Sequence, residues 1–378
     1  MSSTTTTVDL EAGIELLQRA FDEIIAGTKE GGASLSLWRG EECLLSLAGG
    51  EASPGMPWTE KTPCLIWSAS KGVAAACTLH ALQEKGISLQ VPVAALWPEF
   101  AAHGKERITL AELLSHRAGL AAMDQRGLPI TDHETVVAAL AAQPPNWIIE
   151  GNHGYGARTF GFLLDEIVRR VAGETLSGYW NRFFRERLDL DLWFGVPEEK
   201  LAGVATVIAP KTPPAPSPFS RAFADPSSLT RRALSEPGGF LTPSLMNTVA
   251  MRMASIPSLG IIATAEALAR FYALLSSPSD FFTPATISLM QTTISRGLDL
   301  TLLDQTTFSA GFMTNNTGVY GPGKLCFGHP GAGGSLAFAD PEQGFGFAFI
   351  PSAMHPGALP GLRTQKLVQA LYGLPDSE

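Results

Sequence analysis

Residues 66–77 read IWSASKGVAAAC, and the prediction of both the fold and the chemistry of the chain starts from this segment. Ser68 stands three residues before Lys71, so in a helix the hydroxyl and the amine lie on the same side. This spacing suits a nucleophile and its base. The serine could instead cap the alanine-rich helix that follows, with Lys71 in solvent. The four residues SASK alone favour the cap, so the other segments must decide.

The composition indicates a folded, acidic, globular protein. Of 378 residues, 45% are hydrophobic and 17% are charged, which is typical of packed domains. The formal net charge of −9 argues against nucleic acid and anionic membranes as partners, because both require a basic face. The sequence has no apolar run long enough to span a membrane, and its start, MSSTTTTVDLEAG, does not have the pattern of a secretory signal. We therefore expect a cytoplasmic protein.

The cysteines and histidines show no spacing typical of metal sites. Cys43, Cys64, Cys77 and Cys326 form no Cys-x-x-Cys pair, so we expect free thiols in a reducing compartment. The histidines include no His-Glu-x-x-His motif. We expect neither a metal nor another cofactor.

Strand patterns occur near both ends of the chain. Residues 32–40 and 41–50 predict an antiparallel hairpin. Residues 324–340 and 345–354 predict a second strand pair joined by the turn DPEQG. With mostly helical sequence between them, these runs predict an α+β fold, in which one antiparallel sheet built from both chain ends is flanked by helices.

Helical periodicity and composition divide the rest of the chain. Helices are predicted at residues 9–28, 108–120, 158–173, 263–277 and 361–372. Residues 209–244 are rich in Pro, Ser and Thr and predict a long ordered loop over the surface or a cleft. We expect one domain over 1–378, with a sheet lobe at about 9–75 plus 305–378 and an inserted, mainly helical lobe at about 76–304.

Three further segments bear on Ser68. Tyr155 lies in the glycine-flanked loop GNHGYGARTFGFLLDE, just before a helix; by itself such a tyrosine is more often a packing residue. FGHPGAGGS contains His329 and Gly331 at a strand, where glycines allow close approach of a substrate or shape a bulge. LLSHRAGL, at residues 113–120, ends a helix at a glycine.

Taken together and in this order, these segments resemble the serine β-lactamase and penicillin-binding-protein superfamily. The likeness is closest to its class C-like branch of family VIII carboxylesterases and covers about residues 30–355. SASK looks like the Ser-x-x-Lys motif, GYGARTFGFLLDEIVRRVAG like the tyrosine segment, and FGHPGAGGS like the third motif, usually Lys-Thr-Gly or His-Thr-Gly. VPVAALWPEFAAHGKERITLAELLSHRAGL is similar to the connecting helices of the family. These four ordered matches are far more specific than one, and they favour Ser68 as a nucleophile.

The resemblance implies a role for each catalytic candidate. Ser68 would attack an acyl carbon, Lys71 and Tyr155 would exchange protons with it and with the leaving group, and water would hydrolyse the acyl-enzyme. A lysine with its ordinary pKa of about 10.4 is almost never neutral at pH 7, so the pKa of Lys71 must be lowered by roughly three units. Tyr155 as a phenolate could serve instead, and the sequence leaves both possibilities open because the two groups titrate together.

The resemblance also implies an oxyanion hole made by the backbone N–H groups of Ser68 and Ala332. Pro330 departs from the usual threonine of the third motif, so contacts near that strand must differ. The side chain of Ala157 replaces the asparagine of the Tyr-x-Asn motif and offers no hydrogen bond.

The candidate substrate-binding residues are His329, Gly331, Trp147 and His153. His329 replaces a lysine that recognises a carboxylate in β-lactamases, and a mostly neutral imidazole holds a carboxylate more weakly. It could equally be a strand residue that donates to a carbonyl. Trp147 could form the wall of an acyl pocket or be a core residue, and His153 could line the site or be exposed.

These observations predict a serine carboxylesterase that acts on small-molecule esters of short acyl groups. The alternatives are an acyltransferase that moves an acyl group from a thioester or ester to an alcohol, and a hydrolase of the β-lactamase or D-amino-acid amidase type. A non-catalytic binding protein on the same fold is a fourth possibility, which the presence of Ser, Lys and Tyr argues against.

Overall fold

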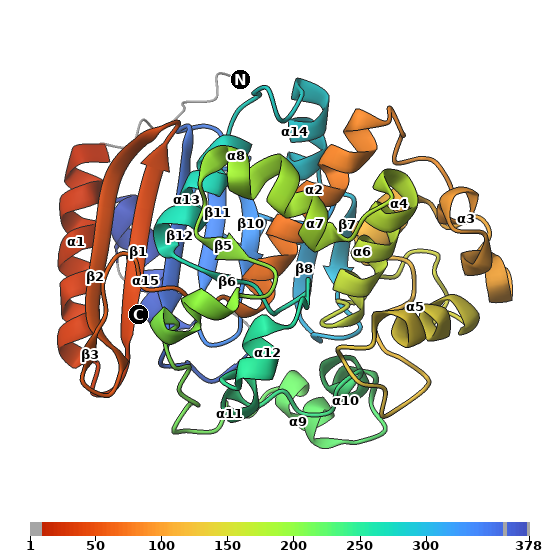
Figure 1. Cartoon of the computed structure of the whole chain (residues 1–378), viewed down its shortest axis with the longest axis horizontal. Coiled ribbons are helices and arrows are strands. Elements are labelled where there is room, and N and C mark those ends of the chain that lie inside the picture. The colour runs from red at the N-terminus through yellow and green to blue at the C-terminus, as the bar shows by residue number, and fades with distance from the viewer. Residues whose placement is uncertain (1–9, 358–360, 376–378) are drawn as a thin grey trace.

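The structure is a computed structural model that describes residues 10–357 and 361–375. Its centre is a nine-stranded antiparallel sheet with the strand order β3-β2-β1-β12-β11-β10-β9-β8-β7 (Figure 1). Its strands are β1 (Gly32–Arg39), β2 (Glu42–Ser53), β3 (Met56–Pro57), β7 (Ser295–Leu298), β8 (Gln305–Phe308), β9 (Met313–Thr314), β10 (Phe327–Pro330), β11 (Leu336–Asp340) and β12 (Phe345–Pro351). The predicted α+β fold is confirmed.

The two halves of the sheet meet where β1 pairs with β12 (Figure 1). In this register Leu35 lies opposite Phe349. Leu35 and Leu37 alternate with Ser34 and Ser36, so the leucines share one face of the sheet and the serines share the other. The leucines pack with Phe347 and Phe349 in one core cluster. This apolar match specifies the pairing of segments more than 300 residues apart.

Helices cover both faces of this sheet. The helices α1 (Leu10–Gly27) and α15 (Leu362–Leu371) pack together on the face that carries Leu35. Helix α13 (Ala265–Leu275) packs on the other face, against β1, β11 and β12. A Cβ at Gly346 of β12 would lie 2.1 Å from the Ala273 nitrogen, so only glycine allows this close approach.

The remaining elements are mostly helices, together with a small second sheet. The α-helices are α2 (Ser70–Glu84), α3 (Val93–Leu96), α4 (Leu110–Leu114), α5 (His133–Ala142), α6 (Thr159–Ala172), α7 (Leu176–Trp180), α8 (Glu186–Leu188), α9 (Pro218–Ala224), α10 (Leu229–Ser235), α11 (Pro243–Met246), α12 (Val249–Met253) and α14 (Pro284–Gln291). Short irregular helices are η1 (Trp67–Ala69), η2 (Pro98–Gly104), η3 (Asn181–Arg185) and η4 (Glu198–Gly203). A small sheet joins β4 (Cys64–Leu65), β6 (Ile262–Ala263) and β5 (Leu192–Trp193). Helix α2 packs against α6 in the middle of this region.

Three details differ from the sequence prediction. The stretch 209–244 is not only loop: it contains α9, α10 and α11, which begin at the capping residues Ser217, Ser228 and Thr242. The helix predicted at 108–120 is the short α4, because the chain turns at Ser115 and His116 has a positive φ of 61°. The expected lobe boundary at 304–305 lies too late, since β7 and α13 already belong to the sheet layer. Within the described ranges, the structure contains no helix with the length and apolar character to cross a membrane.

Candidate active site

Ser68 lies on the single turn η1 that leads into α2, and its side chain is half-buried. The N-cap of α2 is Ala69, with no side-chain capping bond, so the interpretation of Ser68 as a helix cap is wrong. The turn is held from two sides. Ser335 donates its hydroxyl hydrogen bond to the Ile66 carbonyl at 2.8 Å, and the Ser70 hydroxyl accepts from the Ile261 backbone N–H at 3.1 Å.

Lys71 is fully buried one turn after Ser68. Its Nζ donates to the Ala157 and Ser258 carbonyls, both at 2.8 Å, and lies 3.3 Å from the Ser68 hydroxyl. Among the described residues no carboxylate pairs with it. Burial lowers the pKa of Lys71 well below its ordinary value, and the positive charge of Arg158 lowers it further. Both effects favour the neutral form of the amine beside the candidate nucleophile.

Tyr155 is brought to the same place from a distant part of the chain. Lys71 Nζ lies 4.8 Å from the centroid of its ring, and the phenol is buried. Burial raises the pKa of Tyr155 above 10, while a hydrogen bond from Ser68 acts in the opposite direction. Of the two bases that the sequence left open, this environment favours neutral Lys71, with Tyr155 held as a phenol.

Asp299 holds the Tyr155 loop and was missed by the sequence analysis. It is fully buried, and its carboxylate accepts from the backbone N–H groups of Tyr155, Thr301 and Leu302 at 2.8–3.1 Å. Thr306 donates a further hydrogen bond at 3.2 Å. Burial raises the pKa of Asp299, and these backbone hydrogen bonds oppose the rise. The sequence signal was slight: an aspartate two residues before a threonine, as in a side-chain-capped turn.

His153 and Trp147, two candidate substrate-binding residues, lie beside this loop. His153 is buried, and its Nε2 lies 2.8 Å from the Thr306 hydroxyl and 3.9 Å from Asp299. The structure thus places His153 behind the loop, where its Nε2 is occupied, rather than toward a substrate. Trp147 is half-buried, and its ring lies over Gly154, where a Cβ would come within 2.8 Å of it.

Two buried histidines contact the ring of Tyr155, with ring centroids 5.2 Å away for His116 and 5.7 Å away for His329. His329 Nδ1 lies 2.7 Å from the Pro330 carbonyl, which can only accept, so Nδ1 carries the proton and Nε2 presents a lone pair. His116 Nδ1 accepts from the Gly156 N–H at 3.2 Å, so its Nε2 carries the proton. Burial lowers the pKa of His329 to about 3 and that of His116 well below 6.5, so both rings are neutral.

Gly331 and Ala332 follow β10 and lie against the Ser68 turn. A Cβ at Gly331 would lie 2.3 Å from the Ile66 carbonyl oxygen and 3.3 Å from the Ala69 nitrogen, so the absence of a side chain allows the contact. The N–H of Gly331 donates to Ser335. The N–H of Ala332 donates to no acceptor in the described part of the chain, which leaves it available for an external oxygen.

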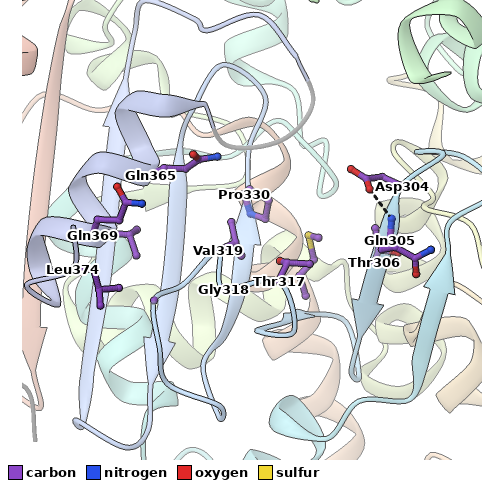
Figure 2. A pocket seen from close by; sticks show the side chains of 13 residues that line it. Asp304, Gln305, Thr306, Thr317, Gly318, Val319, Pro330, Gln365, Gln369 and Leu374 are labelled. Carbon is purple, nitrogen blue, oxygen red and sulfur yellow. Dashed lines mark hydrogen bonds between the residues drawn. The ribbon is translucent and has the colours of Figure 1, made fainter. Parts of the chain in front are cut away.

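Two cavities share Asp304 in their linings, and neither is lined by Ser68, Lys71 or Tyr155. The first has a volume of about 430 Å³ and lies between α15 and β8, with Pro330 at its floor (Figure 2). The second, of about 500 Å³, lies between the loop that leads into α9, Leu302 and the segment at His355. Leu302 and Phe219 of this second cavity pack in the same apolar cluster as Tyr155. Neither cavity is lined by a lysine or arginine of the described chain.

Metal binding finds no support in this arrangement. Over residues 10–357 and 361–375, no group of three or more His, Cys, Asp or Glu side chains is placed to hold an ion.

Comparison with known proteins gives consistent matches over nearly the whole chain. Residues 17–371 match the family described as Beta-lactamase. The chain is 30% identical over 352 residues to the Mycobacterium tuberculosis protein described as Esterase/beta-lactamase LipL, and the match covers 88% of this chain and 79% of that protein.

Two solved structures are similar over 96% of this chain and 97% of their own. One is a penicillin-binding-protein homologue from Caulobacter crescentus, with a TM-score of 0.87 and 31% identity. The other is a family VIII carboxylesterase, with a TM-score of 0.86 and 28% identity.

Proposed function

The chain belongs to the β-lactamase family, and from this premise we propose that it is a serine carboxylesterase that cleaves small-molecule esters of short acyl groups. The observation that carries the proposal is the buried amine of Lys71, 3.3 Å from the half-buried Ser68 hydroxyl on the turn that leads into α2, where burial lowers the pKa of the amine. An alcohol needs such a base within reach to become a nucleophile.

The proposed reaction proceeds through an acyl-enzyme. Lys71 takes the proton of Ser68 as Oγ bonds to the ester carbonyl carbon, and the N–H groups of Ser68 and Ala332 stabilise the oxyanion. The C–O bond to the alcohol then breaks, and the Tyr155 phenol gives its proton to the leaving oxygen. The proton on Lys71 restores the phenol. A water molecule gives a proton to Lys71 as its oxygen attacks the acyl carbon, and Lys71 returns that proton to Ser68 Oγ as the acyl–oxygen bond breaks, which releases the acid and free Ser68.

The charges around the site support a neutral ester as the substrate. His329 is uncharged, and the side chain of Ala157 offers no amide to a lactam side chain. The lining of the two cavities includes Asp304 but, within the described residues, no cation. A substrate carboxylate would therefore find no partner there. The apolar side chains of Leu302, Phe219 and Pro218 around the second cavity suit a short acyl chain.

A second candidate function is acyl transfer to an alcohol. The observation that favours it is that two cavities, one of them lined by Leu302 and Phe219 from the apolar cluster of Tyr155, are each large enough for a small molecule. An acyl group could occupy one cavity while an acceptor alcohol occupies the other and replaces water in the second step.

The test uses purified protein with p-nitrophenyl acetate and butyrate, a chromogenic cephalosporin, and an acyl thioester with an alcohol acceptor. Hydrolysis of the p-nitrophenyl esters that disappears in Ser68→Ala supports the carboxylesterase. Thioester-dependent transfer with negligible hydrolysis would replace it with the acyltransferase. Cephalosporin turnover that exceeds ester turnover would identify a β-lactamase instead.

A further inference from the structure

Asp304 is the one carboxylate that the described residues contribute to the linings of the two cavities. It stands directly before β8, and Figure 2 shows it across the first cavity from α15. Its Oδ1 accepts from the Gln305 N–H at 2.7 Å. In the described part of the chain, no lysine, arginine or histidine forms an ion pair with it. Two cavities therefore share one uncompensated negative charge.

A strained turn fixes the position of Asp304. Leu303, the residue before it, has a φ of 56°, a left-handed conformation that is rare for a bulky side chain. The Leu303 N–H donates to the Asp299 carbonyl, and the Asp299 N–H donates to the Asp304 carbonyl, both at 2.9 Å. Such strain persists only where the surrounding structure enforces it, and it is common at ligand-binding sites. An exposed aspartate that was merely solvated would not require this turn.

The same turn is connected to the groups that are proposed to react. Asp299, which begins the turn, accepts from the Tyr155 N–H with its carboxylate at 3.1 Å. The first cavity also contains Pro330, which directly precedes Gly331 against the Ser68 turn. A ligand group held by the carboxylate of this turn is therefore placed by the segments that also place the Tyr155 loop and the third motif.

The other lining groups do not neutralise this carboxylate. Neither lining contains a lysine or arginine from residues 10–357 and 361–375. His355 lines the second cavity, and burial lowers its pKa below 6.5, so this imidazole is mostly neutral at pH 7. Phe219 lies in the same lining and packs in the apolar cluster of Tyr155. An aromatic ring attracts cations, so Phe219 and the carboxylate favour the same kind of ligand group.

We propose that Asp304 is a specificity-determining residue that recognises a positively charged group, such as a quaternary ammonium, on the ester substrate. The inference rests on the proposed function and extends it: neutral esters are hydrolysed, and esters with a cation in reach of Asp304 are preferred. An anionic ester meets a like charge there. Because Asp304 is exposed to solvent, the preference is modest and sensitive to salt.

The experiment compares esters of equal shape and different charge. One pair is acetylcholine and its carbon isostere, in which carbon replaces the quaternary nitrogen. The other pair is the p-nitrophenyl ester of betaine and its carbon isostere, which place the same group on the acyl side. The charge also changes the intrinsic reactivity of an ester, so each pair is measured in the wild type and in Asp304→Asn, which keeps the oxygen that accepts from Gln305.

The measured quantity is the ratio of kcat/KM for the cationic ester to kcat/KM for its neutral isostere. We expect this ratio to fall by about fivefold to tenfold in Asp304→Asn for at least one pair at low salt. In the wild type it should fall toward the Asp304→Asn value as NaCl is added. The matched control is Asp280→Asn, which removes an exposed carboxylate that lines neither cavity and should keep the wild-type ratio. An unchanged ratio in Asp304→Asn for both pairs would overturn the proposal, as would an equal fall in Asp280→Asn.

Binding without turnover separates this proposal from the proposed function. The probe is tetramethylammonium, whose Kd for the wild type and for Asp304→Asn is measured by NMR titration. Weaker binding to Asp304→Asn in a protein that hydrolyses none of the four esters would uphold the cation site and reject the proposed function. Equal Kd values in a protein that hydrolyses these esters would reject the cation site and retain the proposed function.

Discussion

Replacing Gly331 with alanine should separate the third motif from the Ser68 turn. The added Cβ would lie 2.1 Å from the Ser335 hydroxyl and 2.3 Å from the Ile66 carbonyl oxygen, and the φ of Gly331 is not in the left-handed region, so the conflict is purely steric. Ordinary contacts need about 3.4 Å or more, so the two segments must move apart by roughly 1 Å. This movement breaks the 2.8 Å hydrogen bond from Ser335 to Ile66.

Two magnitudes follow from this movement. Overpacking and the lost hydrogen bond should lower the free energy of unfolding by about 2–4 kcal/mol. Displacement of the Ala332 N–H, the proposed oxyanion donor, should lower kcat by about 100-fold or more, as the loss of one oxyanion donor does. The assays are urea unfolding and p-nitrophenyl butyrate kinetics. The matched control is Gly203→Ala, where a Cβ would meet nothing within 4 Å and stability should change by less than about 0.5 kcal/mol. A Gly331→Ala variant with kcat within threefold of wild type would refute the reasoning.

Three further predictions concern the proton donor, the loop support and acid stability. Tyr155→Phe should lower kcat for the p-nitrophenyl esters by about 100-fold or more, with little change in unfolding midpoint; near-wild-type kcat would remove the phenol from the mechanism. Thr306→Val removes the hydrogen bonds to His153 and Asp299. In urea titrations it should lower the free energy of unfolding by about 2 kcal/mol, and an unchanged value would show that these hydrogen bonds contribute nothing to stability. Burial lowers the pKa of His80 from 6.5 to about 4. The stability that neutral His80 contributes is therefore present above pH 6.5 and is lost as the pH falls toward 4. The free energy of unfolding should fall by up to about 1.4 kcal/mol per pH unit in this range. Urea unfolding at pH 7 and pH 5 should show that the free energy of unfolding falls less between these pH values in His80→Asn than in the wild type. An equal fall in both proteins would contradict the role of His80.

The sheet was predictable because its strands carry local signals. The alternation in β1 and the turn between β11 and β12 identify strands without any long-range information. The helices α9 to α11 were missed because proline and serine were taken as loop residues, although Ser217 followed by Pro218 is also a helix start. The helix α4 was predicted to be too long, because the apolar pattern of the sequence continues past the residue where the backbone turns.

The site was predictable only where a residue stands in a motif. The motifs and their order along the chain identify Ser68, Lys71 and Tyr155, and the structure brings these three residues together. Asp299 is not, because it holds the Tyr155 loop through a backbone N–H group of that distant segment. Hydrogen bonds to carbonyls and N–H groups place no demand on the identity of the partner side chain, so they leave no pattern in the sequence.

The pairing of β1 with β12 joins residues such as Leu35 and Phe349, and this has a consequence for synthesis in the cell. While the ribosome is still translating the middle of the chain, α1 is available to cover one face of the β1–β2 hairpin, but the edge that pairs with β12 is open and the helix α15 has not been made. The strand β12 is made only when almost all of the protein has been translated. We therefore expect the central sheet to close late, and nascent chains that stop before β12 to depend on chaperones.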